Sequence, residues 1–60
     1  MKIRINYNAE WANVEIEKEG KRIACRSYGG SEALNDARNF AAALEEVLGN
    51  CERNEKELDL

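Results

Sequence analysis

The sequence predicts an α+β fold, in which a three-stranded antiparallel meander packs one face against a single C-terminal helix. Two patterns carry this prediction. Apolar and polar residues alternate through the first half of the chain, which is typical of strands, and apolar residues then recur every three or four positions, which is typical of an amphipathic helix. The strands are expected at about residues 2–8, 11–18 and 21–28, and the helix at about residues 32–49.

A two-residue turn at Ala9-Glu10 joins the first two strands. This turn pairs Tyr7 with Ala12, Ile5 with Val14 and Ile3 with Ile16 on one face, and Arg4 with Glu15 and Lys2 with Glu17 on the other. Apolar residues therefore meet apolar residues, and opposite charges meet, along the whole hairpin.

Glu19-Gly20 supplies the turn of the second hairpin, because glycine adopts positive φ at no steric cost. The expected pairs are Lys18 with Lys21, Glu17 with Arg22, Ile16 with Ile23, Val14 with Cys25, and Trp11 with Tyr28. A slip of one residue would send every side chain of the third strand to the other face. This register places Trp11 and Tyr28 together on the solvent face of the sheet.

The helix follows a break at Gly29-Gly30, with Ser31 as its expected N-cap and Gly49-Asn50 as its C-cap. Its apolar face and that of the sheet must bury each other. The expected core contains Ile3, Ile5, Tyr7, Val14, Ile16, Ile23 and Cys25 from the sheet, with Leu34, Ala37, Phe40, Ala41, Leu44, Val47 and Leu48 from the helix. Residues 1–50 thus form one βββα domain, and residues 51–60 form an acidic tail that frays or extends the helix.

Composition restricts the function as well as the fold. Residues 1–31 carry six Lys/Arg and four Asp/Glu, whereas residues 32–60 carry three and eight, which gives the net charge of −3. Such acidity disfavours a dedicated nucleic-acid binder. No apolar run is long enough to cross a bilayer, and the charged start of the chain is unlike a signal peptide. We therefore expect a cytoplasmic protein without membrane contact.

No catalytic or cofactor constellation is predicted. The sequence has no histidine, no metal-ligand cluster and no phosphate-binding loop, so we expect neither an enzyme nor a bound metal or cofactor. Cys25 is expected in the core, and Cys51 on the core side of the helix end. Both are expected to be reduced, as in cytosolic proteins, and one bridge between them is the alternative.

Trp11 and Tyr28 are the leading candidates for contact with a protein partner, because aromatic residues dominate interface hot spots. The expected partner-binding surface contains Trp11, Tyr28, Asn13 and Arg26, with Glu45 and Glu46 of the helix. Two alternatives remain open: the aromatic pair only clips the hairpin ends together, or the tail folds over it.

Cations on the outer sheet face offer a nucleic-acid alternative, through Lys2, Arg4, Arg22 and Arg26. Glu15 and Glu17 lie on the same face, so the favoured interpretation is mutual neutralisation in cross-strand pairs. The acidic helix and tail are interpreted as solvated surface, with mimicry of nucleic-acid phosphates as the alternative.

The first and third strands are expected to leave open edges. Such edges predict either edge-to-edge pairing of two copies or capture of a strand from a partner. A homodimer is favoured, because a domain of this length buries only about 60% of the surface of its unfolded chain.

The order of three strands and one helix resembles two families of DNA-binding domain. Trp11, Gly20-Lys21-Arg22-Ile23, Tyr28 and Ser31-Glu32-Ala33 are similar to the pattern of ethylene-response-factor domains, and the strand order looks like that of the arm-binding domains of tyrosine integrases. The first resemblance implies that the sheet contacts DNA through Arg22, Arg26 and Trp11. Residues 29–44 also resemble the end of a double-stranded-RNA-binding domain, which implies RNA binding.

In format, a short and acidic single domain without enzyme residues, the chain is similar to small phage-encoded anti-defence proteins such as anti-CRISPR proteins. That resemblance implies that it occupies a site on a larger host protein. The leading expectation is therefore a non-enzymatic protein-binding module of the phage or mobile-element inhibitor type. The alternative is a DNA-binding module that uses the outer sheet face.

Overall fold

Strands β1 (Lys2–Tyr7) and β2 (Trp11–Lys18) form the first hairpin in the register that their alternation predicts. The computed structural model describes residues 1–58. At the turn, the side-chain oxygen of Asn8 accepts hydrogen bonds from the backbone N–H groups of Glu10 and Trp11, at 2.8 and 3.0 Å. An Asx turn of this kind fixes the loop length, and loop length sets the register of a hairpin.

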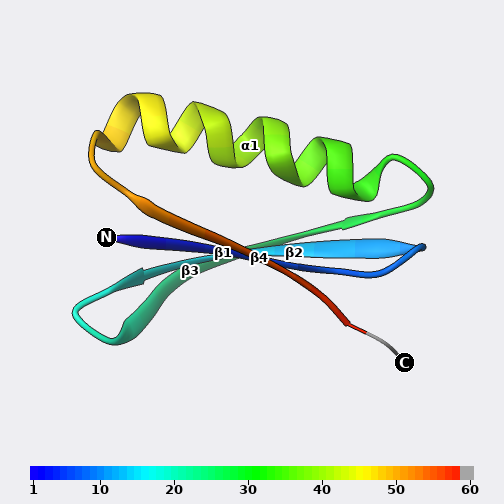
Figure 1. Ribbon diagram of the computed structural model, residues 1–60, viewed down its shortest axis with the longest axis horizontal. Helices are drawn as coiled ribbons and strands as arrows, with labels where there is room; N and C mark the ends of the chain where they lie inside the picture. Colours follow the sequence, from blue (N-terminus) through cyan, green and yellow to red (C-terminus); the bar gives the residue numbers. More distant parts are fainter. Residues whose placement is uncertain (59–60) are drawn as a thin grey trace.

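In the described part of the chain, the sheet has four strands, not three (Figure 1). Strand β3 (Lys21–Gly29) pairs antiparallel with β2, helix α1 (Ala33–Leu48) follows, and strand β4 (Glu52–Glu57) pairs parallel with β1. The spatial order is β3-β2-β1-β4. The expected three-stranded meander is therefore incomplete, although the α+β class and the single helix on one face of the sheet are confirmed.

Strand β4 lies in the segment that was expected to be an acidic tail. Backbone hydrogen bonds extend its pairing with β1 at both ends, from Glu52 N to Met1 O at 3.0 Å and from Leu58 N to Tyr7 O at 2.7 Å. Helix α1 supplies the crossover that a parallel pair needs. Residues 59–60 of the expected tail lie outside the described residues.

The second hairpin departs from its predicted register at one residue. The turn at Glu19-Gly20 is confirmed, with φ values of 53° and 79°. A β-bulge then inserts Ile23, so that Ile16 pairs with Ala24 instead. A bulge places two residues opposite one and thereby exchanges the faces of all residues beyond it.

After the bulge, the side chains of β3 that face the helix are those that unbroken alternation would place on the outer face. The observed pairs are Ala24 with Ile16, Cys25 with Glu15, Arg26 with Val14, Ser27 with Asn13, Tyr28 with Ala12, and Gly29 with Trp11. Since Ala12, Val14 and Ile16 are buried, Arg26 and Tyr28 share the inner face. The expected pairing of Trp11 with Tyr28 is therefore wrong.

Backbone hydrogen bonds cap both ends of helix α1. Its N-cap is Glu32, without a side-chain cap, so the expected cap at Ser31 is wrong. The N–H of Ala33 donates to Gly30 O at 3.1 Å, which satisfies a donor that a serine cap would otherwise serve. At the other end Gly49 N donates to Glu45 O at 3.0 Å with a positive φ, as predicted for a glycine C-cap.

The core lies between α1 and the two central strands. The buried residues are Ile3, Ile5, Ala12, Val14, Ile16, Ala33, Ala37 and Ala41. The three helix alanines follow one stripe and let α1 approach the sheet closely. Four expected core residues are exposed instead: Ile23, Cys25, Val47 and Leu48. Ile23 and Cys25 are exposed because β3 changes faces at the bulge, and Val47 and Leu48 lie in the last turn of α1.

Replacing two isoleucines with alanine tests this assignment of faces. Ile5→Ala should cost about 2–5 kcal/mol of unfolding free energy, because Ile5 is 0% exposed and its truncation leaves a cavity. Ile23→Ala should cost less than about 0.5 kcal/mol, because Ile23 is 56% exposed. Urea unfolding of both variants measures the difference. Equal losses would mean that Ile23 is a core residue.

Candidate partner-binding surface

Trp11 and Tyr28, the two leading candidates of the sequence, lie on opposite faces of the sheet. Trp11 is half-buried on the outer face of β2, where it pairs with Gly29. Tyr28 is half-buried on the inner face, where it packs against the core. Asn13 lies on the outer face with Trp11 and accepts a hydrogen bond from Ser27 Oγ at 2.6 Å. The aromatic pair of the expected contact surface does not exist.

Tyr28 instead joins a cluster with Arg26 and Phe40 on the inner face. The rings of Tyr28 and Phe40 lie 6.4 Å apart at 58°. The guanidinium carbon of Arg26 lies 5.4 Å from the centroid of Tyr28 and 5.3 Å from that of Phe40. These are cation–π distances, so the guanidinium is attracted by both rings and is held at the boundary between β3 and α1.

An apolar groove opens beside this cluster, between β3 and α1. Its volume is about 430 Å³. We call it the β3 groove, and it is lined by Val14, Ile16, Ala24, Cys25, Arg26 and Phe40. Helix α1 covers the inner face of β3 only at the Tyr28 end, since every residue from Lys21 to Ser27 is exposed. Side chains of β2 therefore form its floor, and its outer wall is the edge strand.

Among residues 1–58, four large apolar side chains are exposed: Met1, Ile23, Val47 and Leu48. The N-terminus, the β2–β3 turn and the end of α1 all lie at the same end of the molecule (Figure 1). Val47 is 82% exposed on this end of α1. Isolated apolar residues on a surface are normal, but these four lie on segments that share one end of the molecule.

The sheet has two edges, β3 and β4. The expectation of an open edge at β1 is wrong, because β4 pairs along its whole length. Strand β4 directs charged residues toward the helix, and inward-pointing charges protect an edge strand from pairing. Strand β3 has its bulge near the turn, and its residues Ala24, Cys25 and Arg26 line the β3 groove.

Three of the four candidate phosphate-binding cations are neutralised within the fold. Arg4 lies 3.5 Å from Glu17, Arg22 lies 3.3 Å from Glu15, and Lys2 lies 4.0 Å from Glu52. The fourth, Arg26, stands on the opposite face from the other three. The outer face is therefore a mixed-charge surface rather than a basic patch.

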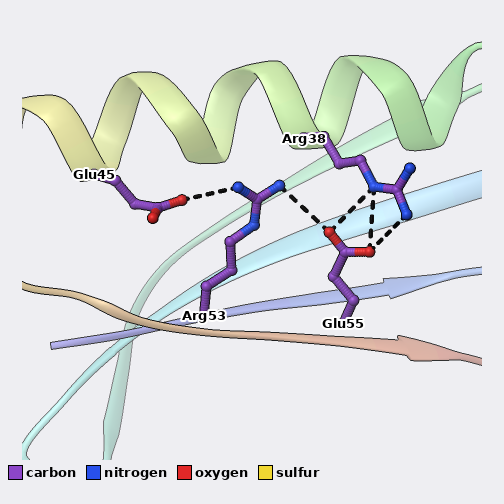
Figure 2. A network of polar contacts seen from close by, with 4 residues as sticks. All are labelled: Arg38, Glu45, Arg53 and Glu55. Atoms are coloured by element: carbon purple, nitrogen blue, oxygen red, sulfur yellow. Dashed lines mark hydrogen bonds and ion pairs between the residues drawn. The ribbon is translucent and has the colours of Figure 1, made fainter.

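The acidic candidates of the helix differ from each other. Glu46 is exposed, whereas Glu45 accepts a hydrogen bond from Arg53 of β4 at 2.9 Å. Arg53 also donates to Glu55 at 3.3 Å, and Arg38 of α1 donates to Glu55 at 2.7 Å (Figure 2). This network of four residues attaches β4 to α1. The hydrogen bond from Arg38 lowers the pKa of Glu55, against a smaller opposing effect of burial.

Within residues 1–58, no group of three or more His, Cys, Asp or Glu side chains is placed to hold a metal ion. Cys25 is exposed, Cys51 is half-buried, and both are free. Across the same part of the chain, no helix has the length and apolar character to cross a membrane. Comparison of the chain with protein-family models, curated proteins and solved structures finds no match.

Sequence reasoning missed the β3 groove because it assumed unbroken alternation in the third strand. The signal was present in Ile23-Ala24-Cys25, three successive residues without a polar partner between them. A period of two places either Ile23 and Cys25 or Ala24 on the inner face, so this run leaves the facing of the third strand undetermined. Ala24 and Phe40 were not among the candidate contact residues, although both line the groove.

The Glu55 network should make stability sensitive to acid. A carboxyl group with a lowered pKa stabilises the fold above its unfolded value of 4.5, and that contribution is lost as the pH falls through the folded value. Glu55→Gln should therefore unfold more easily than the wild type at neutral pH, and the difference should shrink below pH 4.5. Chemical denaturation across this pH range measures it.

Glu46→Gln is the matched control, since Glu46 is an exposed helix glutamate outside the network. It should change neither the neutral stability nor its pH dependence beyond the small effect of one surface charge. If Glu46→Gln and Glu55→Gln behave alike, the network does not hold β4 to the helix.

Proposed function

We propose that this chain is a non-enzymatic protein-binding module whose contact surface is β3 together with the β3 groove. One observation carries the proposal: an exposed nine-residue edge strand lies directly beside an apolar groove of about 430 Å³. Natural proteins usually protect such edges, because unpaired backbone groups recruit another strand.

The mode of binding follows from this geometry. A partner segment in extended conformation adds to β3 through main-chain hydrogen bonds, and its alternate side chains enter the groove. Main-chain pairing supplies affinity, and the fit of side chains against Ala24 and Phe40 supplies selectivity. Arg26 and Phe40, which are in cation–π contact, form one wall for the inserted side chain.

A role as an inhibitor that occupies a site on a larger host protein fits this binding mode. A segment of the host protein that pairs with β3 is no longer free to bind the host protein's other ligands. Free cysteines are typical of reducing compartments, which supports a cytoplasmic setting. A DNA-binding function through the outer sheet face has less support, because glutamates neutralise Arg4 and Arg22 there.

Selection from a random peptide library tests the proposal with two matched variants. Ala24→Gln places a long side chain in the β3 groove, whereas Ser27→Gln places the same side chain on the outer face of the same strand. Peptides selected on the wild type should lose about tenfold or more in affinity for Ala24→Gln, which corresponds to about 1.4 kcal/mol, and little for Ser27→Gln. Fluorescence anisotropy measures both affinities.

Trp11→Ala separates this surface from the one that the sequence predicted. If the β3 groove is the contact surface, Trp11→Ala binds the selected peptides as the wild type does, because Trp11 lies on the other face. Loss of binding in Trp11→Ala with normal binding in Ala24→Gln would assign the contact surface to the outer face instead.

A further inference from the structure

The charge of β3 indicates which kind of partner this surface binds. Strand β3 contains three cations, Lys21, Arg22 and Arg26, and no acidic residue. Arg22 is paired with Glu15. Within residues 1–58, no carboxylate pairs with Lys21 or Arg26, and Lys21 stands opposite another cation, Lys18. The edge is therefore basic on a chain that is acidic overall.

Arg26 is the cation best placed to meet a ligand in the groove. It lies on the inner face opposite Val14, lines the groove and is exposed. Its guanidinium is located by the rings of Tyr28 and Phe40, which take none of its N–H donors. A guanidinium in a preset position binds a carboxylate with a smaller loss of side-chain entropy than a mobile one.

A second copy of the chain fits this edge poorly. Antiparallel pairing of two β3 strands would bring the unpaired cations Lys21 and Arg26 of each copy to one seam that holds no acidic residue of β3, so the two edges repel each other. Nucleic acid fits poorly as well, because the groove wall is apolar. The charge and the groove both match an acidic extended peptide segment.

We propose that the partner contributes an extended acidic segment, in which one aliphatic or aromatic side chain fills the β3 groove and a carboxylate binds Arg26. This inference rests on the proposed function and specifies its partner. Lys21 adds long-range attraction for the same segment, and that attraction weakens as salt screens it.

Three peptide display libraries test the preference for acid. Each holds nine-residue peptides, the length of β3, with random alternate positions, and the fixed positions are glutamate, glutamine or lysine. The glutamate library should yield the tightest peptides, and their affinity should fall as sodium chloride is raised. Arg26→Gln should weaken them about fivefold.

Lys56→Gln is the matched control, because it removes the same charge from the other edge strand, β4. It should leave the affinity near that of the wild type. Arg26→Lys keeps the charge at β3 but not the planar group, so it should retain the preference for glutamate over glutamine peptides. Thermal melts of each variant establish that it is folded.

The outcomes separate this inference from the function on which it rests. Equal selection from the glutamine library overturns the acidic partner but leaves binding through β3 intact. Failure of every library, the fully random one included, overturns both. Displacement of a selected peptide by duplex DNA, or dimerisation in sedimentation that shields β3 amides from exchange, overturns the acidic peptide in favour of DNA or of a second copy.

Discussion

One extra residue in β3 decides which side chains of that strand face the helix. Because Ile23 bulges out of the ladder, Ala24, Arg26 and Tyr28 face α1, and Cys25 and Ser27 face solvent. Without the bulge, Ile23 and Cys25 would continue the apolar face of β2. The bulge thus exchanges two apolar side chains for a small one and a cation, and so creates the groove that the proposed function uses.

The helix covers the sheet unevenly as a result. Its alanine stripe brings it close over β1 and β2, and ion pairs between α1 and β4 hold the other side (Figure 2). Over β3, Phe40 packs against Tyr28 and Arg26. In so small a domain, apolar contact area is scarce. Strand β3 lies largely outside this apolar contact area, and a binding function explains why it is left exposed.

Much of this architecture could be predicted from local patterns, and the rest depends on tertiary contacts. The β1–β2 register follows from strict alternation and the Asn8 turn, and α1 follows from its apolar stripe. Strand β4 could not be found in this way, because its inward residues Arg53 and Glu55 are satisfied by helix charges instead of by burial. The proposed contact surface differs from the expected one because the bulge shifts β3 by one residue. This shift places Trp11 and Tyr28 on opposite faces of the sheet.

Nuclear Overhauser effects between backbone protons of β2 and β3 are the decisive test of the bulge at Ile23, because they report strand register without relying on stability or binding. The bulged register predicts cross-strand contacts from Ile16 to Ala24 and from Ala12 to Tyr28. Contacts from Ile16 to Ile23 and from Trp11 to Tyr28 would contradict it, since the strand would then be regular and the groove would be filled by Ile23 and Cys25.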